Sequence, residues 1–260
     1  MKVIYTPAGK AREYSPKALN IYMSCSHHCE YCYAPNCIHT DRESYYRKPE
    51  PRKDIARMLE MDIRENGAPT EQVLLSFIGD VYCETADHNK ATRDCLEILA
   101  KHQVPTAILT KGGDRCLRDL DLFKKFRAIQ IGTTLTFDND QDSLKWESGA
   151  ATPDERIRML LQLHNEGIRT FASFEPVIDP EQSLNLMAAT LSIVDVYKVG
   201  KLNNYKGLDK KIDWTDFLRR ALEILRPSGK EIYIKYDLRE NAKEIRLTPK
   251  EMEPDIHNVK

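Results

Sequence analysis

Short apolar runs alternate with longer amphipathic stretches along most of this chain. Compact apolar runs of about four to eight residues predict buried strands, and apolar residues spaced three and four apart predict helices with one buried face. The predicted strands span residues 18–23, 73–78, 104–109, 129–136, 168–174, 193–199 and 231–236. The predicted helices span residues 51–66, 87–101, 115–126, 153–166, 181–190 and 213–225.

The helix over residues 153–166 carries the clearest end signals. Thr152 can act as its N-cap, Pro153 fits the first helical turn, and Gly167 follows the last turn. Gly67 likewise follows the helix over residues 51–66. These signals fix two of the helices that separate the predicted strands.

Strands that alternate with helices at this spacing predict βαβ units and therefore a parallel sheet. Six or seven such units in 260 residues fit an α/β fold with a partial (β/α)6-type TIM barrel. A doubly wound open sheet gives nearly the same pattern and stays an alternative. Because no repeat or linker interrupts the chain, we expect a single domain over residues 1–260. Its parts would be an N-terminal extension (1–16), a core (17–200) and a C-terminal closing segment (201–260).

The composition is that of a globular protein with a real core, since 41% of the residues are hydrophobic and 30% are charged. Lys and Arg number 39 against 40 Asp and Glu, so no overall basic surplus indicates nucleic-acid binding, although a local groove stays open. No apolar run reaches the length of a transmembrane helix. The first residues reach Pro7 and a charge before any apolar stretch, so we expect no secretory signal and a cytoplasmic protein.

Seven cysteines lie between Cys25 and Cys116, and none follows. An odd number confined to one part of the chain is a poor fit to a disulfide framework. In a reducing compartment, thiols more often bind metals or take part in catalysis.

Three of these cysteines, Cys25, Cys29 and Cys32, have C-x3-C-x2-C spacing directly after the first predicted strand. Thiolates suit zinc or iron–sulfur clusters. A structural zinc site usually needs two separated cysteine pairs, and the chain has no second C-x2-C pair. Three thiolates on a four-iron cluster leave one iron open for a ligand. Cys37 could add a fourth, so an electron carrier and a zinc structural protein stay open as non-enzyme alternatives.

The motif, with Tyr31 just before the third cysteine, resembles the signature of the radical S-adenosylmethionine (SAM) superfamily. Further segments resemble its spore photoproduct lyase-like (DNA repair photolyase-like) branch, in order and at fitting spacings over residues 9–180. They span residues 9–14, 19–20, 25–34, 79–84, 109–111, 118–119, 133–138 and 147–156.

The resemblance implies a [4Fe–4S] cluster held by the three cysteines, with SAM bound at the open iron. One-electron reduction would split SAM into methionine and a 5′-deoxyadenosyl radical, which abstracts hydrogen from the substrate. The protein would hold SAM and aim the radical, with loops at the carboxyl ends of the strands converging on the site. A reductase, flavodoxin or ferredoxin is the implied electron donor.

Five residues are the candidate SAM contacts that the resemblance implies. Gly79 permits close backbone approach, and the carboxylate of Asp80 can pair with the SAM ammonium. Lys111 can neutralise the SAM carboxylate, Thr134 can bind the ribose or the carboxylate, and Tyr31 holds the aromatic position of the motif. The alternatives are an ordinary strand-to-helix turn, a solvated lysine and a threonine that belongs only to its strand.

Cys83 is the candidate catalytic residue, because a weak S–H bond could return a hydrogen atom to a product radical. Spore photoproduct lyase uses such a cysteine upstream of the matching Asp, where this chain has Phe77, so its lyase reaction does not carry over directly. Cys95 and Cys116 lie on apolar helix faces and are expected in the core. The absence of cysteine after Cys116 predicts a single cluster.

The substrate stays open. The branch favours a nucleic acid or nucleotide, and a peptide or small metabolite is the alternative, because a fold is weak evidence for a substrate. Residues 44–48, with Arg52 and Lys53, mix aromatic and basic side chains as a single-strand groove would, although a solvated connection gives the same composition. Glu175 ends the fifth predicted strand and points toward the expected active face.

Overall fold

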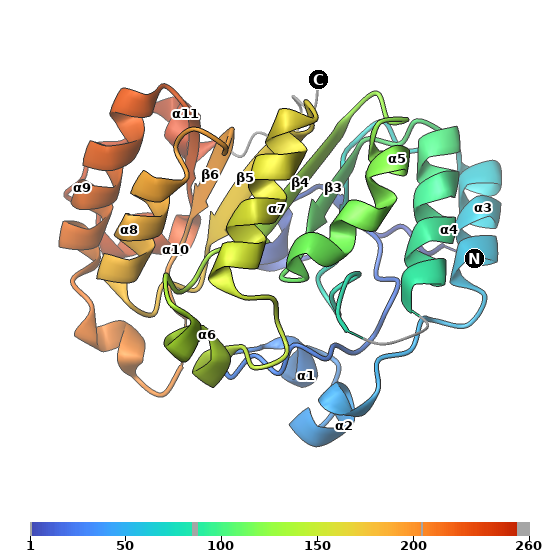
Figure 1. Ribbon diagram of the computed structural model, residues 1–260, viewed down its shortest axis with the longest axis horizontal. Coiled ribbons are helices and arrows are strands. Elements are labelled where there is room, and N and C mark those ends of the chain that lie inside the picture. Colours follow the sequence, from blue (N-terminus) through green and yellow to red (C-terminus); the bar gives the residue numbers. More distant parts are fainter. Residues whose placement is uncertain (1, 85–87, 204, 254–260) are drawn as a thin grey trace.

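The computed structural model describes residues 2–84, 88–203 and 205–253, and within them seven strands form one parallel sheet (Figure 1). Each strand pairs with the next one along the chain. The strands are β1 (Lys17–Ala18), β2 (Val73–Leu75), β3 (Thr106–Leu109), β4 (Ile129–Thr134), β5 (Arg169–Phe174), β6 (Val196–Val199) and β7 (Glu231–Ile234).

This strand order confirms the partial barrel. A doubly wound sheet reverses its order at a switch point, whereas here the spatial order follows the chain without a break. β1 and β7 stay at opposite edges, so the sheet is a curled half-barrel. The predicted six-unit barrel is therefore extended by a seventh strand, which the apolar run over residues 231–236 had indicated.

Helices cover the outer face of the sheet and one of its ends (Figure 1). The outer layer contains α3 (Ile55–Asn66), α4 (His88–Lys101), α5 (Leu120–Phe123), α7 (Pro153–Asn165), α8 (Pro180–Ala189) and α9 (Trp214–Leu225). The short helices α1 (Ala34–Cys37), α2 (Arg42–Arg47) and α6 (Asp140–Trp146) lie together at one end of the sheet. Two more, α10 (Tyr236–Asn241) and α11 (Pro249–Met252), follow β7.

The helix with the clearest sequence signals forms as predicted. Thr152 caps α7 by accepting from the Glu155 amide at 3.2 Å, and the Glu155 carboxylate accepts from the Thr152 amide at 2.7 Å. Met159, Leu160 and Leu163 are fully buried under this helix. The sequence therefore determined both the start of α7 and its buried face.

Other element boundaries differ from the prediction. The first strand covers only Lys17–Ala18, and the second ends at Leu75, because the amides of Phe77 and Ile78 bond to the Asn20 side chain at 3.1 Å instead of to a strand. The predicted helix over residues 115–126 is a 3-10 helix, Gly113–Asp119, followed by the single turn of α5. The predicted helix start at residue 87 and the end of the closing segment, 254–260, lie outside the described residues.

Two sets of side chains line the two faces of the sheet. The main apolar core runs from Val3 to Ala242 and joins the outer helices to the sheet. A separate apolar cluster on the opposite face contains Tyr14, Leu74 and Ala107. In the described part of the chain, no helix has both the length and the apolar character needed to cross a membrane.

Candidate functional site

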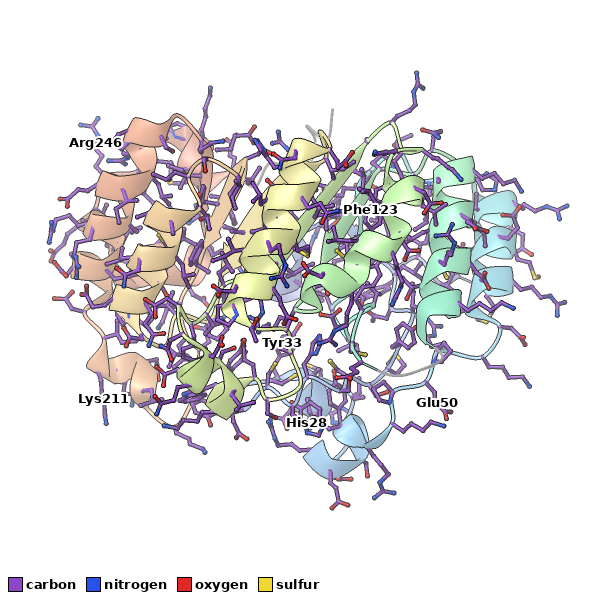
Figure 2. All side chains as sticks on the ribbon, viewed as in Figure 1. His28, Tyr33, Glu50, Phe123, Lys211 and Arg246 are labelled. Carbon is purple, nitrogen blue, oxygen red and sulfur yellow. The ribbon has the colours of Figure 1, made fainter. Side chains whose placement is uncertain are left out.

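The cysteine loop (residues 24–32) follows β1 and lies at the end of the sheet that carries α1, α2 and α6. Figure 2 shows His28 and Tyr33 at this end and Arg246 at the opposite one. Cys25 and Cys29 are buried, Cys32 is partly exposed and Cys37 is exposed. Burial raises the pKa of the Cys29 thiol to about 12, while the nearby Lys111 acts in the opposite direction. A bound metal would have to stabilise the thiolate against this burial.

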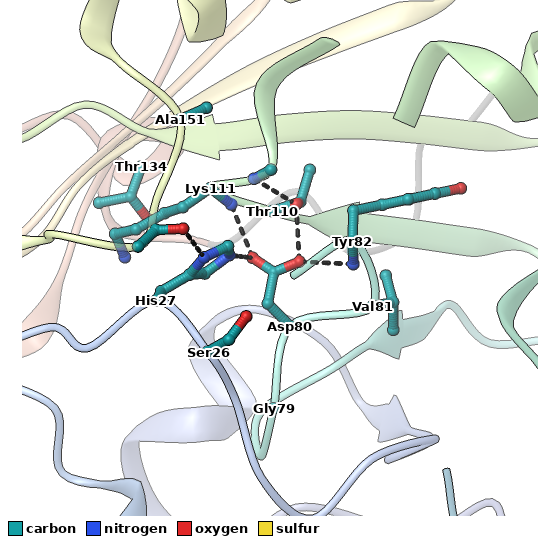
Figure 3. Close-up of polar contacts among 12 residues, drawn as sticks. Ser26, His27, Gly79, Asp80, Val81, Tyr82, Thr110, Lys111, Thr134 and Ala151 are labelled. Atoms are coloured by element: carbon teal, nitrogen blue, oxygen red, sulfur yellow. Dashed lines mark hydrogen bonds and ion pairs between the residues drawn. The ribbon is translucent and has the colours of Figure 1, made fainter. Parts of the chain in front are cut away.

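His27, inside the loop, connects it to the carboxyl ends of β2 and β3 (Figure 3). Its Nε2 forms an ion pair with Asp80 Oδ2 at 3.0 Å, and its Nδ1 lies 3.0 Å from the Gly149 carbonyl oxygen. Both ring nitrogens thus face acceptor oxygens from other loops. His27 is therefore an anchor of the loop.

Asp80 is already fully engaged by the protein (Figure 3). Its Oδ1 accepts from the Thr110 hydroxyl at 2.7 Å and the Tyr82 amide at 2.8 Å, and its Oδ2 accepts from the Lys111 amide at 2.7 Å. Burial alone would raise the pKa of this carboxyl, but His27 and these hydrogen bonds outweigh it and hold the pKa well below its ordinary value. The carboxylate ties the loops after β2 and β3 to the cysteine loop.

Two glycines press directly against the cysteine loop. A Cβ on Gly79 would collide with the Ser24 carbonyl oxygen, and a Cβ on Gly149 would collide with the carbonyl oxygen of Ser26. Gly79 also has φ of +72°, which favours glycine. The segment that closely approaches Gly79 in this structure is the cysteine loop, and the contact of Gly79 with SAM stays a prediction.

A buried ion pair supports the loop from the other side. Glu147 and Arg156 are each 1% exposed, and Arg156 Nη2 donates to Glu147 Oε2. Arg156 also donates to the carbonyls of Thr134 at 3.0 Å and Ala151 at 2.9 Å. Tyr31 donates to the Glu147 carboxylate. The aromatic residue of the cysteine motif is thus fixed by a charged pair whose carboxylate directly follows α6 and whose guanidinium lies on α7.

Lys111 directly follows Thr110 at the end of β3, and its side chain extends toward Tyr31. Its Nζ lies 5.5 Å from the centre of the Tyr31 ring. Among the described residues, no carboxylate forms an ion pair with this ammonium. Thr134, the last residue of β4, is buried, and its carbonyl is bound to Arg156. The structure thus brings the predicted SAM contacts together at one edge of the sheet.

Cys83 lies beside the cysteine loop. It is buried in a cluster with Cys25, Tyr45, Tyr46 and Ile78. A hydrogen bond with Cys83, together with burial, raises the pKa of Cys25. Cys83 therefore lies against a predicted cluster ligand on the α2 side, and it is absent from the cluster around Tyr14 on the inner face of the sheet. The other cysteines outside the loop, Cys95 and Cys116, are buried in the main core, as predicted.

The same cluster corrects one interpretation of the sequence. Tyr45 and Tyr46 are only 2% and 7% exposed, because they pack under the cysteine loop. Bases could not stack on these rings without unpacking the loop. The aromatic and basic residues at positions 44–48 are therefore a support for the loop, and a single-strand groove at this segment is wrong.

The cysteine donors fit an iron–sulfur cluster. Within the described ranges, no three His, Cys, Asp or Glu side chains lie close enough to hold one metal ion. Thiolates that bind different irons of a cluster need not converge on one point. Three soft ligands on one loop, two of them buried, are the donors that iron–sulfur clusters use.

A polar cluster on the inner face of the sheet was not predicted. The Tyr14 hydroxyl lies 2.8 Å from the Ser173 hydroxyl and donates to the Glu175 carboxylate at 3.0 Å. Lys235 pairs with Glu175, and Lys198 Nζ lies 5.3 Å from the Tyr14 ring centre. Lys198 and Lys235 are 2% and 3% exposed. Barrel interiors are usually filled by branched apolar side chains, so this polar interior marks the inner face as unusual.

Two proteins of similar sequence illustrate what the chain resembles. An uncharacterized protein of Methanocaldococcus jannaschii is 31% identical over 163 residues, which are 62% of this chain and 60% of that protein. An uncharacterized protein of Mycobacterium tuberculosis is 25% identical over 167 residues, 62% of this chain and 49% of that protein. The matches thus span about half to three fifths of these relatives.

Two solved structures share the fold. SuiB of Streptococcus suis bound to SAM superposes with a TM-score of 0.61 at 17% identity, covering 89% of this chain and 53% of that one. A mutant spore photoproduct lyase with bound SAM and a dinucleoside spore photoproduct superposes with a TM-score of 0.64 at 14% identity, covering 90% of this chain and 79% of that one. The family model described as the radical SAM superfamily matches residues 19–192. That match covers the half-barrel from the cysteine loop to α8, and the chain belongs to the radical SAM superfamily.

Proposed function

We propose that this chain is an enzyme that binds a [4Fe–4S] cluster through Cys25, Cys29 and Cys32 and SAM at the open iron. When bound and reduced, the cluster supplies the electron that splits SAM into methionine and a 5′-deoxyadenosyl radical. The observation that carries the proposal is the three-cysteine loop at the carboxyl edge of a radical SAM half-barrel.

The described contacts support two different roles for the predicted SAM residues. Lys111, with no carboxylate partner in the described part of the chain, is available for the SAM carboxylate, and Tyr31 beneath it is fixed by Glu147. Asp80 already accepts from two backbone amides and a hydroxyl and pairs with His27, so we assign it to positioning the loops. Gly79 belongs to the same support, and Thr134 is retained as a candidate for the ribose.

Cluster binding is tested by anaerobic reconstitution and iron and sulfide analysis. We expect about four irons per chain in the wild type and a large loss in Cys25→Ala, Cys29→Ala and Cys32→Ala. The exposed Cys37 provides the matched control, because Cys37→Ser should keep the full iron content. Equal loss in the Cys37 variant would indicate a four-cysteine centre, and about eight irons would refute the single cluster.

For the substrate we propose a nucleic acid or nucleotide, following the resemblance to spore photoproduct lyase. A second candidate is a peptide, because SuiB has been solved with its precursor peptide SuiA. Each candidate is supplied with deuterium at its carbon positions, and label in 5′-deoxyadenosine identifies the substrate. Nucleic-acid binding should fall steeply with added salt, and undetectable binding at low salt would favour the peptide or a small metabolite.

Cys83 is retained as the proposed hydrogen-atom donor, with a specific test. Its burial against Cys25 means that a substrate must reach past the cluster loop to contact it. If Cys83 is the donor, Cys83→Ala should still split SAM but leave the substrate radical unquenched and change the products. Unchanged products in that variant would move the assignment to a group on the inner face.

A further inference from the structure

The outer side of the cysteine loop is held by one short helix, α2. Arg42 donates from Nη2 to the Cys29 carbonyl at 2.7 Å and from Nη1 to the Cys32 carbonyl at 3.3 Å. The Tyr46 hydroxyl donates to the same Cys29 carbonyl at 2.8 Å. Three hydrogen bonds from this helix thus reach the backbone of two proposed cluster ligands.

Neighbouring rings keep the guanidinium in this place. The centre of the Arg42 guanidinium lies 5.3 Å from the centre of the Tyr46 ring, and Nη2 also lies 3.4 Å from the Tyr46 hydroxyl. His28, in the cysteine loop, stacks on the Tyr46 ring, with the two ring centroids 4.6 Å apart and an interplanar angle of 26°. Arg42 is therefore a fixed cation beside the loop that carries Cys29 and Cys32.

We propose that Arg42 is a positioning residue that holds the turn between Cys29 and Cys32 and raises the reduction potential of the bound cluster. The inference rests on the proposed function. Reduction adds one negative charge to the cluster, and a guanidinium keeps its positive charge at any working pH. A fixed nearby cation stabilises the reduced form more than the oxidised form, and local charge is one of the properties that set cluster potentials.

The same helix offers a matched control. Arg47 carries the same charge, is exposed like Arg42, and pairs with Glu43 at 3.3 Å at the far end of α2. Arg47→Gln therefore removes one positive charge from α2 without removing a hydrogen bond to the cysteine loop. Arg42→Gln removes the charge and the two bonds, whereas Arg42→Lys keeps the charge and loses the forked geometry.

The experiment is a potentiometric titration of the reconstituted proteins without SAM. The electron paramagnetic resonance signal of the reduced cluster measures the fraction reduced at each potential. Each variant is first assayed for iron and sulfide. We expect Arg42→Gln to lower the equilibrium constant for one-electron reduction of the cluster about tenfold, which corresponds to a midpoint potential about 59 mV lower. Arg42→Lys and Arg47→Gln should stay within about twofold of the wild type in the same equilibrium.

Each outcome decides the matter. Equal potentials in Arg42→Gln and Arg47→Gln overturn the inference, and so does an Arg42→Lys potential as low as that of Arg42→Gln. If Arg42→Gln assembles no cluster while the other two variants do, and Arg42→Lys keeps the wild-type potential, the positioning role is supported. A wild type that assembles no cluster overturns the proposed function, and this inference with it.

Discussion

Replacing Asp80 by Asn tests whether this carboxylate supports the site or only contacts SAM. The substitution keeps the shape and removes the charge. Oδ1 faces the Thr110 hydroxyl and the Tyr82 amide, and Oδ2 faces His27 and the Lys111 amide. In either orientation of the new amide, its NH2 group points at a backbone N–H, so one buried donor loses its acceptor.

The expected cost follows from these contacts. A buried donor without a partner costs about 1–3 kcal/mol, and the ion pair with His27 is lost as well. We expect Asp80→Asn to lower the free energy of unfolding by about 2–4 kcal/mol. At about 2–4 °C for each kcal/mol in a chain of this size, the melting temperature should fall by roughly 4–16 °C.

Urea unfolding of the anaerobic, reduced chain measures this loss, with Asp154→Asn as the control. Asp154 is exposed in the first turn of α7, and its replacement should stay within about 0.5 kcal/mol of the wild type. If Asp80→Asn unfolds like the wild type but the reconstituted protein no longer binds SAM, the anchoring role is refuted and the direct contact with the SAM ammonium is supported.

Three further predictions follow from the same contacts. Because the folded pKa of Asp80 lies below its unfolded value, the stability that its carboxylate contributes is complete above about pH 4 and is lost as pH falls through the folded pKa. The difference in unfolding free energy between wild type and Asp80→Asn, measured by urea unfolding, should therefore narrow as pH falls below about 4. Glu147→Gln leaves the buried Arg156 without a charged partner and should cost about 3–5 kcal/mol, against less than about 1 kcal/mol for Glu223→Gln in an exposed pair. Equal costs in urea unfolding would contradict the buried network. Gly149→Ala places a methyl group against a carbonyl of the cysteine loop and should reduce iron incorporation severalfold, so full iron content would refute the close packing.

Local signals in the sequence predicted the parts of the site that depend on neighbouring residues. The cysteine spacing and the cap of α7 are set within a few residues, and the alternation of strands and helices gave the half-barrel. The turn that follows β2 is held by Asn20, which lies far away in the sequence. The early end of β2 could therefore not be predicted from an apolar run. The contacts of Arg42 with the cysteine loop are likewise made only in the folded chain.

The inner-face cluster had a sequence signal that was available. Lys198 interrupts the apolar run over residues 193–199, and Lys235 lies in the run over residues 231–236. A lysine inside a predicted buried strand is rare without a partner, so each marked a polar site on one face. The partners themselves, Tyr14 and Glu175, could be identified only once the topology was known.

The central claim is that the three-cysteine loop assembles a cluster that cleaves SAM. The most direct measurement is the formation of 5′-deoxyadenosine by the anaerobically reconstituted protein with dithionite and SAM. The account predicts 5′-deoxyadenosine and methionine from the wild type and none from Cys29→Ala. A wild-type protein with a demonstrated cluster that forms no 5′-deoxyadenosine would contradict it.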